Sequence, residues 1–257
     1  MEVIIMKNRE AATTLTAKLI AAKVKSKPSC VLGMATGRTM EEVYDMIVAM
    51  NLDFSSVTTF NLDEYIGLEG TNKNSYRYYM NENLFKKINI KLYNTYLPNG
   101  MAKNMKEECE KYERLISDHG GIDIQLLGLG KSGHIGFNEP LSSLFSRTRE
   151  KALTQTTIDQ NSGLFDKPQD MPKRALTMGV GTILEAKKIL MLATGKDKAE
   201  ILAKAVEGPI TSMISATALQ LHPSCTVICD EEAASDLKEK AYYRWIFQNE
   251  PEWQPYR

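Results

Sequence analysis

A histidine and a glutamate stand five residues apart in a glycine-rich turn, and together they could move protons. His134 and Glu139 lie within residues 128–140, where four glycines occur in the first nine positions. An imidazole beside a carboxylate can take up and release a proton near neutral pH, because the carboxylate fixes the tautomer and alters the pKa. The turn therefore predicts a proton relay, and the alternative is an ordinary glycine turn with a solvated histidine.

A second turn combines groups that bind anions. Residues 35–39 offer a glycine, two hydroxyls and a guanidinium directly before a predicted helix, namely Thr36, Gly37, Arg38 and Thr39. Free backbone N–H groups at the start of a helix, together with such side chains, can hold a phosphate. The alternative is a capped helix start with a surface arginine.

A third turn carries two adjacent carboxylates, Asp63 and Glu64, at the end of a predicted strand. Neighbouring side chains point in different directions, so at most one of them is expected to face a pocket. That carboxylate could act as a base, and the alternative is a solvated acidic turn.

The elements expected around these turns alternate between strand and helix. Strands are predicted at residues 3–6, 30–34, 57–61, 122–129, 175–178, 189–193, 218–221 and 225–229, and helices at 9–24, 40–50, 75–87, 107–117, 182–185, 198–206 and 232–248. Residues 153–172 have weak periodicity and are expected to be irregular. This alternation predicts one α/β domain over residues 1–257 with a mainly parallel sheet. Because the carboxyl ends of parallel strands share one edge, the three turns are expected to surround one crevice.

Composition narrows the possible partners. The chain has 257 residues with 32 basic and 32 acidic side chains, so no net field attracts nucleic acid or an anionic membrane. No apolar run reaches the roughly 18 residues of a membrane span, and no charged-then-apolar leader is expected. The four cysteines lack zinc-site spacing and favour free thiols in a reducing cytoplasm.

Several segments, in matching order and spacing up to about Leu237, resemble the glucosamine-6-phosphate deaminase family. The matching segments are residues 60–65, 133–140, 146–149, 175–182 and 219–223. The resemblance implies conversion of glucosamine 6-phosphate to fructose 6-phosphate and ammonia, without a metal or organic cofactor. It also implies a modified doubly wound (Rossmann-like) sheet with helices on both faces, and a homo-oligomer such as a hexamer.

The resemblance assigns roles to single residues. Asp63 would be the base that moves the C2 proton of the sugar, and His134, oriented and charged by Glu139, would assist ring opening. Residues 36–39 would be the phosphate loop, Lys198 would add a phosphate-binding ammonium, and residues 153–172 would be a mobile lid. The alternative for Lys198 is an ordinary solvated lysine at a helix start.

Three positions depart from the family pattern. Ser132 replaces an aspartate or asparagine, so it can hydrogen-bond but cannot add negative charge beside His134. Gly163 stands where the family has a lid arginine that grips the phosphate, a loss on the order of 1.5–3 kcal/mol. Arg38 replaces a glycine of the phosphate loop. Its guanidinium either compensates for the lost arginine or partly fills the pocket and changes which sugar fits.

A second anion site is implied by the same resemblance. The hydroxyl and basic residues Ser142, Ser143, Arg149 and Lys151 match positions that bind N-acetylglucosamine 6-phosphate between subunits in allosteric members. The alternative is a set of exposed charges at a subunit contact. Three other functions stay open: a galactosamine-6-phosphate deaminase, a 6-phosphogluconolactonase, and a noncatalytic sugar-phosphate sensor.

Overall fold

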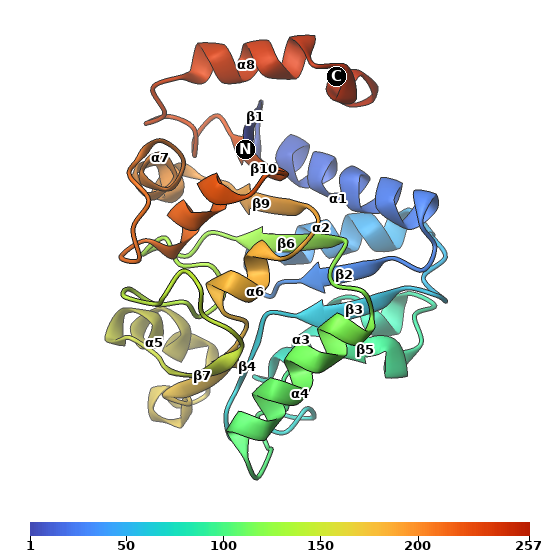
Figure 1. Cartoon of the computed structure of the whole chain (residues 1–257), viewed down its shortest axis with the longest axis vertical. Helices are drawn as coiled ribbons and strands as arrows, with labels where there is room; N and C mark the ends of the chain where they lie inside the picture. Colours follow the sequence, from blue (N-terminus) through green and yellow to red (C-terminus); the bar gives the residue numbers. More distant parts are fainter.

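The computed structural model describes residues 1–257, and its centre is a seven-stranded sheet in which every strand pair is parallel. The order across the sheet is β1-β10-β9-β6-β2-β3-β5. These strands are β1 (Glu2–Met6), β2 (Val31–Met34), β3 (Thr58–Asn61), β5 (Thr95–Tyr96), β6 (Ile124–Gly128), β9 (Ile189–Ala193) and β10 (Cys225–Asp230). In Figure 1 the arrowheads of β9, β6, β2 and β3 point to the same side of the molecule. The carboxyl ends of these strands therefore form one edge.

Helices cover the sheet, and their ends follow from local residue types. In α1 (Arg9–Ser26), the Asn8 side chain accepts a hydrogen bond from Ala11 N at 2.9 Å and so caps the first turn. Another helix against the sheet, α4 (Met105–Asp118), ends before Gly120 and Gly121, which are both at positive φ. The other helices beside the large sheet are α2 (Arg38–Ala49), α3 (Tyr76–Asn83), α6 (Val180–Leu184), α7 (Ala199–Glu207) and α8 (Lys240–Asn249). Figure 1 shows α4 and α6 in front of the sheet and α2 and α3 behind it.

A smaller antiparallel sheet lies beside the large one. It has the order β4-β8-β7, formed by β4 (Asp63–Tyr65), β8 (Arg174–Thr177) and β7 (Arg149–Ala152). The connection from β7 to β8 carries α5 (Gln155–Asn161) and two short 3₁₀ turns. This small sheet thus joins the Asp63 segment to the base of the segment expected to be a lid.

Two hydrophobic clusters hold these parts together. The main core contains 55 buried residues from the large sheet and its helices. The second cluster has six, and it packs Tyr65 and Phe137 against Leu153, Phe165 and Met171 from the segment 153–172. The second cluster therefore fixes that segment over the start of the small sheet.

Most of the predicted elements are confirmed, with three corrections. Residues 218–221 are not a strand but part of a 3₁₀ helix, Ser215–Leu221. The final helix begins only at Lys240, because residues 231–236 form turns after β10. Residues 153–172 are not wholly irregular, since Thr154 caps α5 by accepting from Thr157 N. The prediction also missed β4, β5 and β7, which have only two to four residues each. No helix is long and apolar enough to cross a membrane.

Candidate functional site

The loop expected to bind phosphate begins α2 at the carboxyl end of β2. Gly37 precedes the helix with φ 118° and has no side chain to cap it, so the first N–H groups of α2 stay free of side-chain partners. Tyr79 from α3 donates its hydroxyl to Gly37 O at 2.8 Å and fixes the loop from outside. A helix start held in this way is suited to an anion.

The Arg38 and Thr39 side chains lie in the first turn of α2. Arg38 is exposed and makes no ion pair, so its guanidinium is free to reach a ligand. Thr39 is half-buried. Thr36 is held differently, because its hydroxyl contacts the Tyr76 hydroxyl.

Asp63 lies at the carboxyl end of β3, as the first residue of β4, and its side chain is only 6 % exposed. Burial, with a further contribution from the Glu64 charge, raises the pKa of Asp63 to about 8. The carboxyl is therefore mainly protonated at neutral pH in the free protein. A buried carboxyl with such a pKa is basic enough to remove a proton once it is ionised.

Glu64 has a different function, which the solvated-turn alternative did not foresee. Its Oε1 accepts from Tyr65 N and Tyr76 N, and its Oε2 accepts from Arg77 N at 2.9 Å. It therefore holds the first N–H groups of α3, where the helix dipole favours a negative charge. Only Asp63, of the two neighbouring carboxylates, is available to the site.

The glycine-rich turn comes next to Asp63. Gly136 packs so closely that a Cβ atom there would lie 3.5 Å from Asp63 Oδ2 and 3.0 Å from Thr177 Oγ1. Thr177 accepts from Phe137 N at 3.0 Å and so joins the turn to β8, which pairs with β4. Asp63 therefore lies against Gly136, which is two residues after His134 and three before Glu139 in the same turn.

His134 has two partners on one nitrogen. Its Nδ1 lies 2.8 Å from Ser132 Oγ and 3.6 Å from Glu139 Oε2. Burial lowers the pKa of His134, the Glu139 carboxylate opposes this change, and the Lys198 charge lowers the pKa further. The imidazole is thus mainly neutral at pH 7, and it can accept a proton and later return it.

The backbone under the imidazole must be glycine. A Cβ atom at Gly130 would lie 2.3 Å from His134 Nε2, so any side chain there would displace the ring. Gly133 has φ 76° and packs against Ile201 and Ile214. The glycines therefore position the imidazole as well as permitting the turn.

Lys198 reaches the same locality from the next strand of the sheet. It directly precedes α7 after β9, and its side chain is largely buried. Burial lowers the pKa of Lys198, although the nearby Asp197 opposes this. The positive charge of Lys198 therefore disfavours protonation of His134.

The four residues of the implied second anion site do not contact Asp63 or His134. Ser142 is buried and its N–H donates to Glu139 O, whereas Ser143 is exposed and accepts from Phe145 N. Arg149 donates from Nη1 to Asn138 Oδ1 at 2.8 Å. Lys151 is half-buried on β7 and makes no ion pair. Two of the four therefore support the backbone around Glu139 from outside.

Sequence reasoning missed three aromatic residues that line the locality. Tyr76 stacks on Phe137, and its hydroxyl donates to the Tyr65 hydroxyl at 3.3 Å. The Tyr76 hydroxyl also contacts Thr36. The richness of residues 75–87 in tyrosine was a signal, but it did not show that one of these rings connects the phosphate loop with Asp63.

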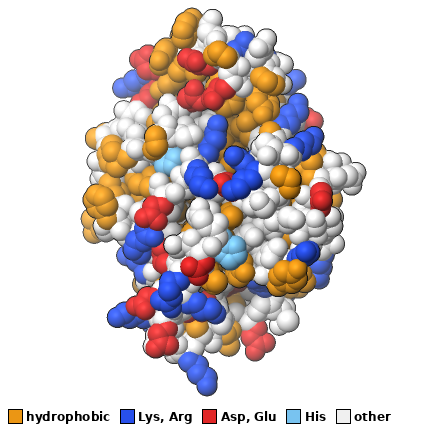
Figure 2. All heavy atoms as spheres, turned by 45° about the vertical axis from the view of Figure 1, so that its right-hand side comes forward, with side chains coloured by type: hydrophobic (Ala, Val, Ile, Leu, Met, Phe, Trp, Pro, Cys, Tyr) orange, Lys and Arg blue, Asp and Glu red, His pale blue; other side chains and the backbone are white.

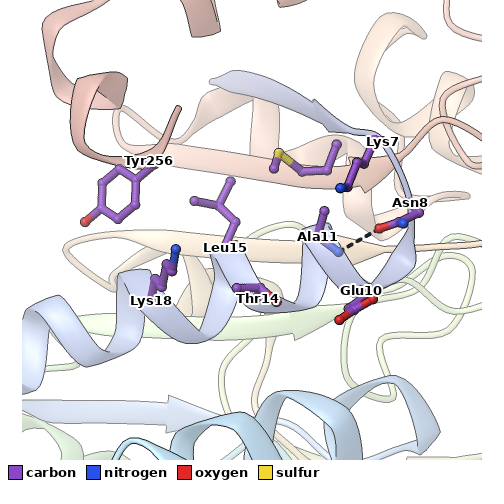
Figure 3. A pocket seen from close by; sticks show the side chains of 9 residues that line it. Lys7, Asn8, Glu10, Ala11, Thr14, Leu15, Lys18 and Tyr256 are labelled. Carbon is purple, nitrogen blue, oxygen red and sulfur yellow. Dashed lines mark hydrogen bonds between the residues drawn. The ribbon is translucent and has the colours of Figure 1, made fainter.

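The other hollows and charged clusters lie away from this locality. A pocket of about 290 Å³ opens between α1 and Tyr256, next to Lys7 and Lys18, and contains none of the predicted site residues (Figure 3). Figure 2, with the right-hand side of Figure 1 turned forward, shows basic side chains gathered around acidic atoms. Asp123 has such surroundings, with Lys27 Nζ at 2.7 Å and Lys187 Nζ at 2.9 Å. No group of three or more His, Cys, Asp or Glu side chains is arranged to hold a metal ion.

Solved structures place this fold among sugar-phosphate enzymes. One described as a monomeric glucosamine-6-phosphate deaminase is 44 % identical, with a TM-score of 0.89 over 92 % of this chain and 100 % of its own. A 6-phosphogluconolactonase from Leishmania guyanensis, 19 % identical with a TM-score of 0.72, covers 92 % and 98 % of the two chains. That second likeness shows the fold alone.

Curated relatives agree over nearly the whole chain. The glucosamine-6-phosphate deaminase of Shewanella loihica is 49 % identical over 96 % of this chain and 93 % of its own. The same-named protein of Clostridium perfringens is 48 % identical over 93 % and 100 %. Residues 7–230 match the family described as glucosamine-6-phosphate isomerases/6-phosphogluconolactonase. By this match and by the arrangement of its strand ends, the chain belongs to that family.

Proposed function

We propose that this chain is a glucosamine-6-phosphate deaminase, which converts glucosamine 6-phosphate and water to fructose 6-phosphate and ammonia. The observation that carries the proposal is the packing of Asp63 beside the His134 turn, at the edge where the start of α2 offers an anion site. Relatives with this name, 47–49 % identical, support it.

Binding of the phosphate positions the sugar. The free N–H groups at the start of α2, the Thr36 and Thr39 hydroxyls, the Arg38 guanidinium and Lys198 supply donors and positive charge. Held at this end, the sugar extends toward Asp63 and His134, and part of the barrier is removed by orientation alone. These roles are assigned here because the donors lie at the same strand edge as Asp63.

Asp63 moves the proton at C2. The protonated amino group of the substrate brings a positive charge to the site, and a nearby cation lowers the pKa of a carboxyl. Asp63 is therefore ionised when substrate binds, takes the C2 proton and delivers it to C1. The buried surroundings keep the carboxylate basic during this step.

His134 acts at the ring oxygen, where a proton must arrive as the ring opens. The neutral imidazole takes the proton of the C1 hydroxyl and gives it to the ring oxygen as the C1–O5 bond breaks and the C1 aldehyde forms. The Glu139 carboxylate stabilises the imidazolium that exists between these two transfers. Ser132 holds Nδ1 and leaves Nε2 for the sugar. The family has aspartate or asparagine at this position, so a negative charge is not required there. We therefore expect Ser132 to tune the enzyme and not to inactivate it.

An assay of ammonia release tests this function. Purified protein should release ammonia from glucosamine 6-phosphate and form fructose 6-phosphate in equal amounts. Galactosamine 6-phosphate and 6-phosphogluconolactone serve as competing substrates in parallel reactions. Preferred deamination of the galactose epimer, hydrolysis of the lactone alone, or tight binding without turnover would each replace the proposed function with one of its alternatives.

Regulation and assembly extend the proposal. Ser142, Ser143, Arg149 and Lys151 would bind N-acetylglucosamine 6-phosphate between subunits of a homo-oligomer such as a hexamer, in the cytoplasm. Support comes from apolar side chains exposed beside these residues, Leu141 and the 89 % exposed Phe145. Light scattering with and without N-acetylglucosamine 6-phosphate tests both ideas, and a monomer with unchanged kinetics contradicts them.

A further inference from the structure

One buried carboxylate connects the lid segment with the proton relay. Glu139 is 2 % exposed, and its two oxygens face opposite partners. Oε1 accepts from Thr157 Oγ1 at 2.5 Å and from Thr154 N at 3.3 Å, both in the first turn of α5. Oε2 has no hydrogen-bond donor and lies 3.6 Å from His134 Nδ1. The orientation of the carboxylate toward the imidazole is thus set by what holds Oε1.

Thr157 is held in place to make this contact. Its side chain is 2 % exposed, and its hydroxyl accepts from Thr154 Oγ1 at 3.2 Å while it donates to Glu139. Thr154 is the N-cap of α5, so the hydrogen bonds from Thr154 to Thr157 and from Thr157 to Glu139 start at the cap of this helix. A hydroxyl has one proton to donate, and Thr157 directs this proton to Glu139.

The other end of α5 contacts tyrosines that lie next to the phosphate loop. Asn161 Nδ2 donates to the Tyr65 hydroxyl at 3.1 Å, and Tyr76, which contacts Thr36 of the phosphate loop, donates to the same oxygen. This short helix therefore makes a polar contact with Glu139 from its first turn and with Tyr65 from its last residue.

We propose that Thr157 is a positioning residue, through which the seating of α5 on the site fixes Glu139 against His134. The inference rests on the proposed function, since it assigns the lid a part in preparing the proton relay. Binding of a sugar phosphate that seats α5 would then ready the imidazole at the other end of the sugar.

The charges that face His134 define the expected effect. Burial lowers the pKa of His134, the Lys198 ammonium lowers it further, and only the Glu139 carboxylate raises it. Thr157→Val keeps the size of the side chain but removes the donor to Oε1. Glu139 then turns away from Nδ1 or loses its charge, and in either case the pKa of His134 falls.

Histidine side-chain NMR measures this without turnover. The chain has three histidines, so His119 and His222 act as internal controls. In Thr157→Val we expect the pKa of His134 to fall by about half a unit or more, with His119 and His222 unchanged. Thr157→Ser, which restores the hydroxyl, should titrate like the wild type, and Thr157→Ala should follow the valine variant if valine disturbs folding.

Kinetics provide the second measurement. Thr157→Val should lower kcat about fivefold or more with little change in KM, and Thr157→Ser should recover it. An unchanged or raised pKa of His134 in both hydroxyl-free variants overturns the inference, as does a joint shift of all three histidines. Absence of ammonia release with the pKa shift intact would instead sink the proposed function and leave the coupling standing.

Discussion

At the scale of single residues, the proposed mechanism depends on one carboxyl, Asp63, that is kept neutral until substrate arrives. Asp63 is buried next to Glu64, whose charge is fixed by three N–H groups of the chain. The cost of ionising Asp63 in the free protein is therefore built into the fold. Active sites commonly hold a reactive group in surroundings that make it reactive at a cost in stability.

The first prediction concerns turnover. Asp63→Asn keeps the shape and removes the base, so exchange of the C2 proton and ammonia release should fall by about 1,000-fold or more, while sugar-phosphate binding stays within a few-fold. Solvent-proton exchange followed by NMR, together with calorimetric binding, checks both parts. Turnover at the wild-type rate would remove Asp63 from its role.

The second prediction concerns pH and stability. The folded pKa of about 8 lies above the ordinary unfolded value, so the folded state holds an extra proton between about pH 4 and pH 8. Stability attributable to Asp63 is present below that window and is lost as pH rises through it. The free energy of unfolding of Asp63→Asn, minus that of the wild type, should therefore be about 1 kcal/mol or more higher at pH 9 than at pH 4. Urea unfolding at the two pH values measures this. The same difference between variant and wild type at both pH values would contradict the argument that burial raises the pKa of Asp63.

At the scale of elements, the proposed phosphate site involves the start of α2 and the segment 153–172. Gly163 has open space around it, because a Cβ atom there would meet nothing within 4 Å. The family arginine is thus missing without any steric cause, and Arg38 on the first turn of α2 is free to replace it.

The third prediction tests this exchange. Arg38→Gly should raise KM for the sugar phosphate about fivefold or more with little effect on kcat, because a phosphate contact serves binding first. Gly163→Arg in the same background should recover most of the loss. If KM is unaltered in Arg38→Gly, the guanidinium does not hold the phosphate.

The regular elements could be predicted from sequence because their signals are local. The β9 strand, Ile189–Ala193, is a continuous apolar run, and Asn8 caps α1 as expected. Strand β4 was missed because Asp63–Tyr65 is too short to show alternation and pairs with residues more than a hundred positions away. Strand β7 was missed because Arg149–Ala152 contains no alternating apolar residues. Likewise, the turn at residues 128–140 indicated His134 and Glu139, but only the fold shows that Thr157 donates to Glu139 and that Tyr76 stacks on Phe137.

At the scale of the whole molecule, the last turn of the chain belongs to the main core. Trp253 is 1 % exposed and packs with Phe247 and Tyr256, with Lys188 Nζ 5.8 Å from its ring centre. On α8, Trp245 is 55 % exposed and stacks only on Tyr242. The two tryptophans of the chain thus form a matched pair, one buried and one exposed.

The fourth prediction uses this pair. Trp253→Ala should lower the free energy of unfolding by about 3 kcal/mol or more, because it leaves a large cavity in the core. Trp245→Ala should change it by roughly 0.5 kcal/mol or less. Urea unfolding followed by circular dichroism measures both, and equal losses would mean that the last turn is not part of the core.

The place of the C-terminal segment has a consequence for how separate molecules meet. β1 pairs with β10 on one side only, so the other side of this apolar strand is an open row of backbone donors and acceptors. Figure 1 shows α8 lying along that border of the sheet, and α8 contacts β1. Uncovered, such a border recruits strands from other copies and leads to aggregation. By covering this border, α8 therefore protects the protein from uncontrolled self-association.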